Sequence, residues 1–426
     1  MKKAGRFLSA LLAAAMMVPA MAGCGKDDAK QTNDGADGKT AAAQTELNLY
    51  YWDESFRDTM NEIVTAFEAQ NTDIKLNVTT IPWGEYWTKL QTTLPSSSGP
   101  DVFWLNYMYT LEFAPKGLLT PVADASIDKS KYPQATLDMG THDGKLYNVP
   151  FMLDTVALVY NKDLFDVAGV DYPTADWTWN DLREAAKKLT VKDDSGKTRQ
   201  YGYCVDPQSQ MGTYNFLYQN GVTVYDDDQM TPNFNSDAGK EAFQFQYDMV
   251  FTDGSSPTGA QLEELGKDDR FMSGQIAMLY TVAPRMTKYY EALGDSLDAV
   301  TLPVGKEAAC TLNACSFAGS AKSAHPDEVQ RFLAFTASEE CQKIIAKMAM
   351  PPYEGAADSW ASSFGGANAK AFIDAIDTAR PLALTTKDAG ATRKIFETEC
   401  ANIFAGAKPI DQALADAETQ ILSTLS

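Results

Sequence analysis

Aromatic, carboxylate and amide side chains gather at the ends of the strands that the sequence predicts. In open α/β sheets, ligands bind beyond the carboxyl ends of strands, so these positions mark the expected site. Aromatic rings stack on the C–H faces of sugars, and carboxylates and amides bind hydroxyl groups in a mostly apolar cleft. The six candidates of this kind are Trp52, Asp53, Glu54, Asn106, Tyr107 and Asp154.

The sequence offers few side chains for acid–base or metal chemistry. It has two histidines, His142 in a turn sequence and His325 before a helix start, where a capping or surface role is expected. No nucleophile elbow, phosphate-binding glycine motif or zinc spacing is present. The aspartate run 226–228 predicts a solvated turn rather than a calcium loop. We therefore expect no catalytic residue, no metal and no cofactor.

Two alternatives to sugar binding stay open at this stage. The acids Asp53, Glu54 and Asp154 would suit a polyamine or another cation. Asp53 and Asp154 would also suit an extracellular glycoside hydrolase, in which their separation sets the stereochemical outcome.

Strand and helix patterns alternate along the chain. Residues 47–51, 74–78 and 101–105 predict strands, and residues 60–67 and 83–94 predict helices between them. This order favours a largely parallel sheet covered by helices. Further helices are expected after Asn180 as an N-cap, from Pro326, and over 410–421, and a further strand over 156–160. Three tryptophans within these patterns are expected in the core: Trp83, Trp87 and Trp104.

The N-terminus predicts export. A basic start, an apolar run from Phe7 to Ala20 and small residues before Cys24 make residues 1–23 a signal peptide. The Met-Ala-Gly-Cys ending is similar to a bacterial lipobox, which predicts a diacylated Cys24 as the membrane anchor, with simple signal cleavage as the alternative. Residues 24–45 hold no large apolar side chain and are expected to be a flexible linker.

The net charge limits which classes of partner are expected, and the cysteine content limits which disulfides are possible. The chain of 426 residues has a net charge of −21, which becomes −24 when the signal peptide is removed. Such an acidic surface argues against nucleic acid and against electrostatic binding to anionic lipid. Of six cysteines, Cys310 and Cys315 are close enough to pair, but small buried thiols are the favoured interpretation.

The order and spacing of nine short stretches resemble one family. The chain is similar to the bacterial extracellular solute-binding proteins of ABC transporters, in the carbohydrate-binding group similar to maltose-binding protein. The resemblance runs from about Glu46 to the C-terminal helix. The matching stretches are 67–71 (FEAQN), 83–92 (WGEYWTKLQT), 100–104 (PDVFW), 117–119 (GLL), 143–150 (DGKLYNVP), 160–165 (YNKDLF), 177–182 (WTWNDL), 271–278 (FMSGQIAM) and 318–326 (AGSAKSAHP).

The resemblance implies a periplasmic-binding-protein-like fold with two α/β lobes, a hinge and a ligand cleft between the lobes. Residues 46–153 plus 302–350 would form the N-terminal lobe, and 154–301 plus 351–426 the C-terminal lobe. Together with the lipobox-like ending at Cys24, it predicts a monomer that is anchored by lipid at the extracellular face of the bacterial cytoplasmic membrane. This monomer would bind a small molecule, most simply a carbohydrate, and deliver it to permease subunits.

Position by position, the resemblance adds further ligand contacts. Asp154 matches an acidic residue near the hinge that contacts sugar hydroxyls in the family. Where many members carry a stacking Trp after the Ala-Met strand, this chain has Tyr280-Thr-Val-Ala-Pro-Arg285. Tyr280 would then supply a stacking face from another angle, or the ligand is not held there by stacking. The contacts that the resemblance adds are Tyr214, Tyr280, Arg285, Phe317 and Gly319.

Overall fold

The computed structural model describes residues 44–226 and 228–426, which form one compact unit. The predicted signal peptide, Cys24 and nearly all of the predicted linker lie outside the described residues. Among the described residues, no helix is long and apolar enough to cross a membrane.

The first third of the chain alternates strands and helices as predicted. Leu47, Leu49 and Tyr51 are buried on one face of the first strand, because successive side chains of a strand point to opposite faces. The elements are β1 (Thr45–Tyr51), α1 (Arg57–Gln70), β2 (Ile74–Thr80), α2 (Trp83–Thr93), β3 (Val102–Asn106), α3 (Tyr107–Phe113), α4 (Gln134–Gly140), β4 (Thr141–His142) and β5 (Lys145–Leu146).

The middle of the chain begins with the long strand β6. Its elements are β6 (Asn148–Asn161), α5 (Lys162–Ala168), α6 (Trp179–Lys188), β7 (Val191–Lys192), β8 (Thr198–Cys204), α7 (Tyr214–Gln219), α8 (Asp237–Tyr247), α9 (Gly259–Glu264), α10 (Lys267–Met272), β9 (Ile276–Val282), α11 (Met286–Leu293) and β10 (Leu297–Val300). The N-cap of α6 is Thr178, in a capping box with Asp181, so the prediction of Asn180 as the cap is wrong by two residues.

The last part of the chain begins with β11, followed mainly by helices. Its elements are β11 (Cys310–Gly319), α12 (Pro326–Thr336), α13 (Glu339–Ile345), α14 (Ala356–Ala361), α15 (Lys370–Asp374), β12 (Ala379–Pro381), α16 (Ala389–Phe404) and α17 (Ile410–Leu425). The helix starting at Pro326 is confirmed. His325 occupies its N-cap position, but its side chain caps no backbone N–H.

The sheet is mixed rather than largely parallel, which corrects the sequence prediction. Strand β1 is parallel to β2 and β3, and β8 is parallel to β9. In the centre, β11 is antiparallel to both β3 and β6, and β6 is antiparallel to β9. The strand order is β2-β1-β3-β11-β6-β9-β8-β7. The centre is antiparallel because two long strands connect the halves of the unit in opposite directions.

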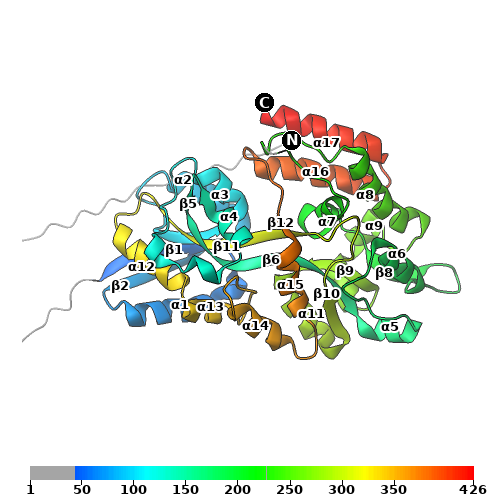
Figure 1. Cartoon of the computed structure of the whole chain (residues 1–426), viewed down its shortest axis with the longest axis horizontal. Coiled ribbons are helices and arrows are strands. Elements are labelled where there is room, and N and C mark those ends of the chain that lie inside the picture. The colour runs from blue at the N-terminus through cyan, green and yellow to red at the C-terminus, as the bar shows by residue number, and fades with distance from the viewer. Residues whose placement is uncertain (1–43, 227) are drawn as a thin grey trace, which may run out of the picture. The chain divides into compact units, whose positions relative to one another are not determined.

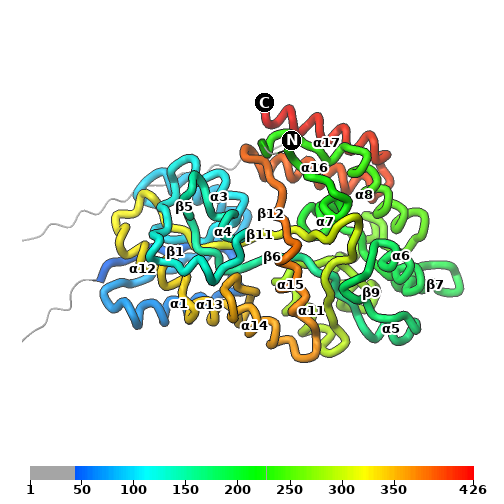
Figure 2. Tube along the Cα trace, viewed as in Figure 1, coloured from blue at the N-terminus to red at the C-terminus, as the bar shows by residue number. Residues whose placement is uncertain are grey.

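Two hydrophobic cores divide the described chain. One core holds side chains of β1, β2, β3, α1 and α12 and the start of β6 up to Met152; the other takes β6 from Leu153 onward, with β8, β9, α7 and α16. On β11 the change falls between Ala314 and Cys315. Figure 1 shows β6 and β11 running between the two groups of helices, and the tube in Figure 2 shows the chain passing between the groups again from α13 to α14. The two cores are those of a two-lobed α/β fold.

Candidate functional site

Where the strands cross between the cores, two polar side chains stand side by side. Asn313 on β11 lies opposite Asp154 on β6 in the register of the sheet. The Asn313 Nδ2 donates to Oδ2 of Asp154 at 3.4 Å, and only 5% of Asn313 is exposed. The Oδ1 atoms of both side chains are buried, and neither has a hydrogen-bond partner among the described residues.

Burial changes the ionisation of Asp154. It raises the pKa of this carboxyl to about 7, while hydrogen bonds from the amides of Gln210 and Asn313 oppose the rise. A carboxyl group that loses water without gaining a full set of partners is destabilised in its charged form. Asp154 therefore accepts further hydrogen bonds at low cost if a ligand brings donors to it.

The buried thiol of Cys315 joins this pair to the ends of β1 and β3. Asn106 lies opposite Cys315 in the sheet, and its Nδ2 is 3.8 Å from Sγ. Burial, followed by the charges of Asp154 and Asp53, holds the pKa of the thiol well above its usual range. We call this set the polar cluster; its members are Asp53, Asn106, Asp154, Gln210, Asn313 and Cys315. Three of the sequence candidates thus lie together.

The thiol is free, as are the four other cysteines of the described chain, all of them buried. The interpretation of Cys310 and Cys315 as buried thiols is therefore confirmed. No group of three or more His, Cys, Asp or Glu side chains arranged for a metal ion is found in the part of the chain that the structure describes.

Aromatic rings crowd the carboxyl ends of β1 and β3. Trp52 meets Trp83 edge-on with ring centroids 5.2 Å apart, and Trp87 stacks on Tyr109 at 3.6 Å with an interplanar angle of 10°. We call Trp52, Trp83, Trp87 and Tyr109 the aromatic platform. Trp83 is 44% exposed, which corrects the expectation that it is a core residue; Trp87 is buried as expected. Trp83 is exposed because it is the first residue of α2.

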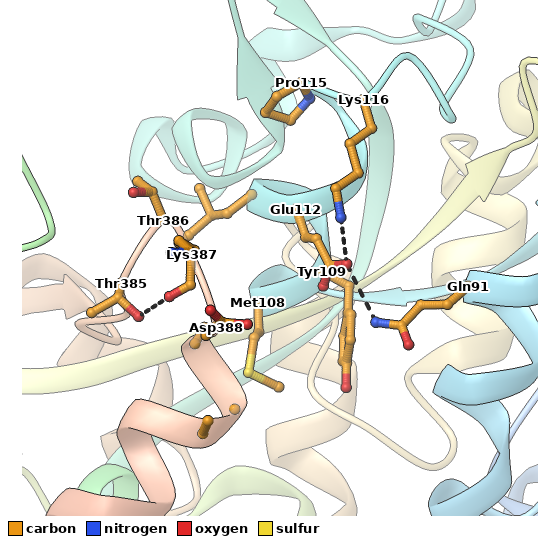
Figure 3. Close-up of a pocket in the computed structure, with 14 residues that line it drawn as sticks. Gln91, Met108, Tyr109, Glu112, Pro115, Lys116, Thr385, Thr386, Lys387 and Asp388 are labelled. Carbon is orange, nitrogen blue, oxygen red and sulfur yellow. Dashed lines mark hydrogen bonds and ion pairs between the residues drawn. The ribbon is translucent and has the colours of Figure 1, made fainter. Parts of the chain in front are cut away.

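A cavity of about 390 Å³ lies between the two lobes at α3. Figure 3 shows Tyr109, Glu112 and Lys116 on one side and Thr385, Lys387 and Asp388, just before α16, on the other. The Glu112 carboxylate accepts hydrogen bonds from Lys116 at 2.8 Å and from Gln91 at 3.3 Å. Both walls of this cavity are polar, and an aromatic ring faces into it.

Tyr107 lines a second interlobe cavity, also of about 390 Å³, together with Tyr218, Arg380 and Leu384. The Arg380 guanidinium lies 5.6 Å from the centre of the Tyr218 ring and donates to Glu307 at 2.6 Å. The two cavities adjoin, because residues 380–384 line one and residues 385–391 line the other.

Four sequence candidates lie in the cores. Tyr280 is 1% exposed and stacks on Phe216 with centroids 5.1 Å apart, and Tyr214 packs on Phe396 at 4.9 Å. Phe317 packs between Trp104 and Phe151, and a Cβ added to Gly319 would come within 2.5 Å of Val329. All four residues are buried.

Two charged candidates are held in ion pairs with side chains outside the polar cluster. Glu54 follows β1 but pairs with Arg57 at the exposed start of α1. Arg285 follows β9 and pairs with Asp268 of α10, which also accepts from the Tyr289 hydroxyl at 2.7 Å.

Several residues of the site escaped sequence reasoning. Asn313 stands inside an apolar strand pattern, and its polarity there is the one signal that marks it. Gln210 lies in a π-helical turn, Ser209–Thr213, which has no sequence signature but is typical of functional sites. The segment 385–391 follows no strand of the predicted alternation, so no local sequence signal marks it as part of a site.

Comparisons with known proteins show the family and the fold to which the chain is similar. The sequence profile described as bacterial extracellular solute-binding protein matches residues 53–343. An ABC substrate-binding protein of Listeria monocytogenes, solved with cycloalternan, is 29% identical, with a TM-score of 0.80 over 90% of this chain and 99% of that one.

Curated relatives match over shorter spans. The diacetylchitobiose-binding protein of Streptomyces coelicolor is 30% identical over 44% of each chain. The maltodextrin-binding protein of Bacillus subtilis is 22% identical over 78% of this chain and 76% of its own length. The chain spans about half the length of the first curated relatives that it matches.

Proposed function

The chain belongs to the bacterial extracellular solute-binding protein family, and from this premise we propose that it is the receptor of an ABC importer. It binds a sugar or oligosaccharide between its two lobes and delivers it, unmodified, to the permease subunits. Its relatives' printed ligands, which include maltodextrin and diacetylchitobiose, support a carbohydrate.

The observation that carries the proposal is the pair of unpartnered acceptors on Asp154 and Asn313, buried where β6 and β11 cross between the lobes. Sugar hydroxyls supply the donors that these oxygens lack. The aromatic platform lies at the ends of the neighbouring strands, as a sugar-binding cleft requires. A ligand that contacts both lobes would favour the closed arrangement by its differential affinity.

We further propose that the receptor acts as a monomer outside the cytoplasmic membrane, tethered by a diacylated Cys24 and the linker 24–45. The support is the sequence alone: the basic start, the apolar run and the small residues before Cys24. For the lobes we propose 46–153 plus 302–350 and 154–301 plus 351–426. The buried hydrophobic side chains between Leu302 and Ala314 pack in the second core, although this proposal assigns them to the N-terminal lobe.

The test is a ligand search on the purified chain without its signal peptide. Maltotriose, cellotriose, triacetylchitotriose and arabinotriose are screened by thermal shift and tryptophan fluorescence, and native mass spectrometry reports any retained ligand. At least one sugar should raise the melting temperature and should be recovered intact. If no sugar binds, or if the bound sugar is hydrolysed, the receptor assignment is wrong.

A second candidate ligand, a polyamine, is favoured by one observation. No positive charge contributes to the pKa of Asp154 in the described part of the chain, and the charges of Asp154 and Asp53 both raise the pKa of the Cys315 thiol. Spermidine in the same screen distinguishes the two ligand classes. Competition by spermidine with every bound sugar would favour a polyamine as the ligand.

A further inference from the structure

The interlobe cavity at α3, of about 390 Å³, has charged side chains on both of its walls. The wall at α3 carries Glu112 and Lys116, and the wall just before α16 carries Lys387 and Asp388 (Figure 3). Each wall thus holds one acid and one base. Opposite charges attract more strongly as the distance between them falls, so these walls attract each other when the lobes approach.

One cation of α16 is available for a new partner. Arg393 makes no side-chain hydrogen bond or ion pair with the described residues, whereas every other described arginine makes at least one. Arg393 is nonetheless only partly exposed. A guanidinium group carries several N–H donors in a fixed geometry that matches a carboxylate, so an acid that comes near Arg393 can form an ion pair with it.

Arg393 belongs to the face of α16 that borders the cavity. Ala389 and Gly390 line the cavity, and residues three or four positions apart share one face of a helix. Helical side chains lean toward the N-terminus of their helix, so we expect the guanidinium to lie over this wall. Burial, followed by the charge of Glu112, raises the pKa of Tyr109 to about 12, and the charge of Arg393 opposes the rise. Charges from the two lobes therefore act on the same ring.

We propose that Arg393 and Glu112 form an ion pair across the cavity when the lobes close on a ligand, and that this pair stabilises the closed form. The inference rests on the proposed function. In this structure, Glu112 pairs with Lys116 of its own lobe at 2.8 Å. Once Glu112 accepts from Arg393, Lys116 is free to turn toward Asp388 on the opposite wall. Glu112 and Arg393 are thus positioning residues, which hold the lobes together around the ligand.

Charge exchange tests the pair, because reversing both charges restores an ion pair but does not restore a direct contact with the ligand. The variants are Glu112→Arg, Arg393→Glu and the double variant. The probe is maltotriose, cellotriose, triacetylchitotriose or arabinotriose, whichever binds in the sugar screen. Each single variant places like charges across the cavity and should weaken binding about threefold to tenfold in isothermal titration calorimetry at low salt. The double variant should bind within about twofold of the natural protein.

Salt and a neighbouring residue provide the controls. At about 0.5 M NaCl, the loss in each single variant should shrink, because salt screens charges near the surface. Lys394→Glu is the matched control, since Lys394 is the next residue of α16 and is exposed. It should leave the affinity unchanged, and a loss equal to that of Arg393→Glu would overturn the inference as a general effect of charge.

Two further results would separate the inference from the receptor role. If the single variants bind as tightly as the natural protein, or if the double variant binds as weakly as the single ones, the two side chains do not pair across the lobes. The inference then falls while the receptor role stands. If none of the trisaccharides binds to the natural protein, the proposed function fails and the inference fails with it.

Discussion

Two aromatic groups of this molecule, one in each lobe, look alike in sequence but differ in the structure. The aromatic platform surrounds Trp52 and Trp83 and leaves Trp83 half-exposed, whereas Tyr280 and its neighbours Tyr203 and Phe216 are almost wholly buried. Trp52 was expected to contact ligand because it follows a strand, and Tyr280 because of the family resemblance, whereas Trp83 and Trp87 were expected in the core.

The difference comes from where each ring stands relative to its strand. Tyr280 lies inside β9, between β6 and β8 in the sheet, and Phe216 of α7 stacks on its ring. Trp83 opens α2 directly after the β2 strand and the Ile81-Pro82 turn. Trp83, three residues past the end of β2, is thus 44% exposed, whereas Tyr280, within β9, is 1% exposed.

The largest effect is expected from truncating the buried ring. Tyr280→Ala removes an aromatic side chain from the core and should lower the free energy of unfolding by about 3–5 kcal/mol. Tyr280→Phe keeps the ring and should cost less than about 1 kcal/mol, because the hydroxyl has no hydrogen-bond partner among the described residues. Urea unfolding at pH 7 measures both. A loss below about 1 kcal/mol for the alanine variant would contradict the core placement.

The next effect concerns Asp154, which stands where the two lobes meet. Its pKa is raised from 3.8 to about 7 by burial, so the folded protein disfavours the ionised form. In the ligand-free protein, the stability should therefore be highest below pH 4 with respect to this group and should fall as the pH rises toward 7. The ligand, on this view, supplies donors that the ionised carboxyl lacks.

Asp154→Asn removes this pH dependence. Without ligand, the variant should match the natural protein at pH 4 and exceed its stability at pH 8 by up to about 4 kcal/mol, since each pKa unit corresponds to about 1.4 kcal/mol. Urea unfolding at the two pH values measures the difference, with Asp194→Asn, in an exposed turn between β7 and β8, as the control for net charge. An equal effect of Asp154→Asn at both pH values would show that the carboxyl is not destabilised by burial.

The sequence predicted the local elements well and the assembly of the sheet less well. Strands and helices up to β3 follow from periodicity, since alternate residues such as Leu47 and Leu49 are buried together. The antiparallel centre of the sheet could not be predicted from periodicity, because no local pattern in β6 or β11 indicates which strand pairs with it. Only the family resemblance indicated that these strands connect two lobes.

The site was partly predictable for the same reason. Asp53, Asn106 and Asp154 lie near Cys315, because strand ends can be located from local patterns. Gln210 and Asn313 reach the same point from segments that are distant in sequence, and their contribution depends on strand register and on a π-helical turn. Such long-range placement leaves no local pattern to find.

The smallest change in stability is expected for a substitution at Trp83. This substitution also distinguishes the two aromatic groups most directly. Its exposed ring contacts Trp52 and Trp87, so Trp83→Ala should cost no more than about 1 kcal/mol of stability. Sugar affinity should fall about twofold to tenfold, because a stacked aromatic contributes about 0.5–1.5 kcal/mol. Tyr172→Ala is the matched control: Tyr172 is 39% exposed and packs on Tyr160 in the other lobe. If both variants leave the sugar affinity unchanged, the aromatic platform does not contact ligand. The exposed Trp83 ring would then belong to a surface with another role.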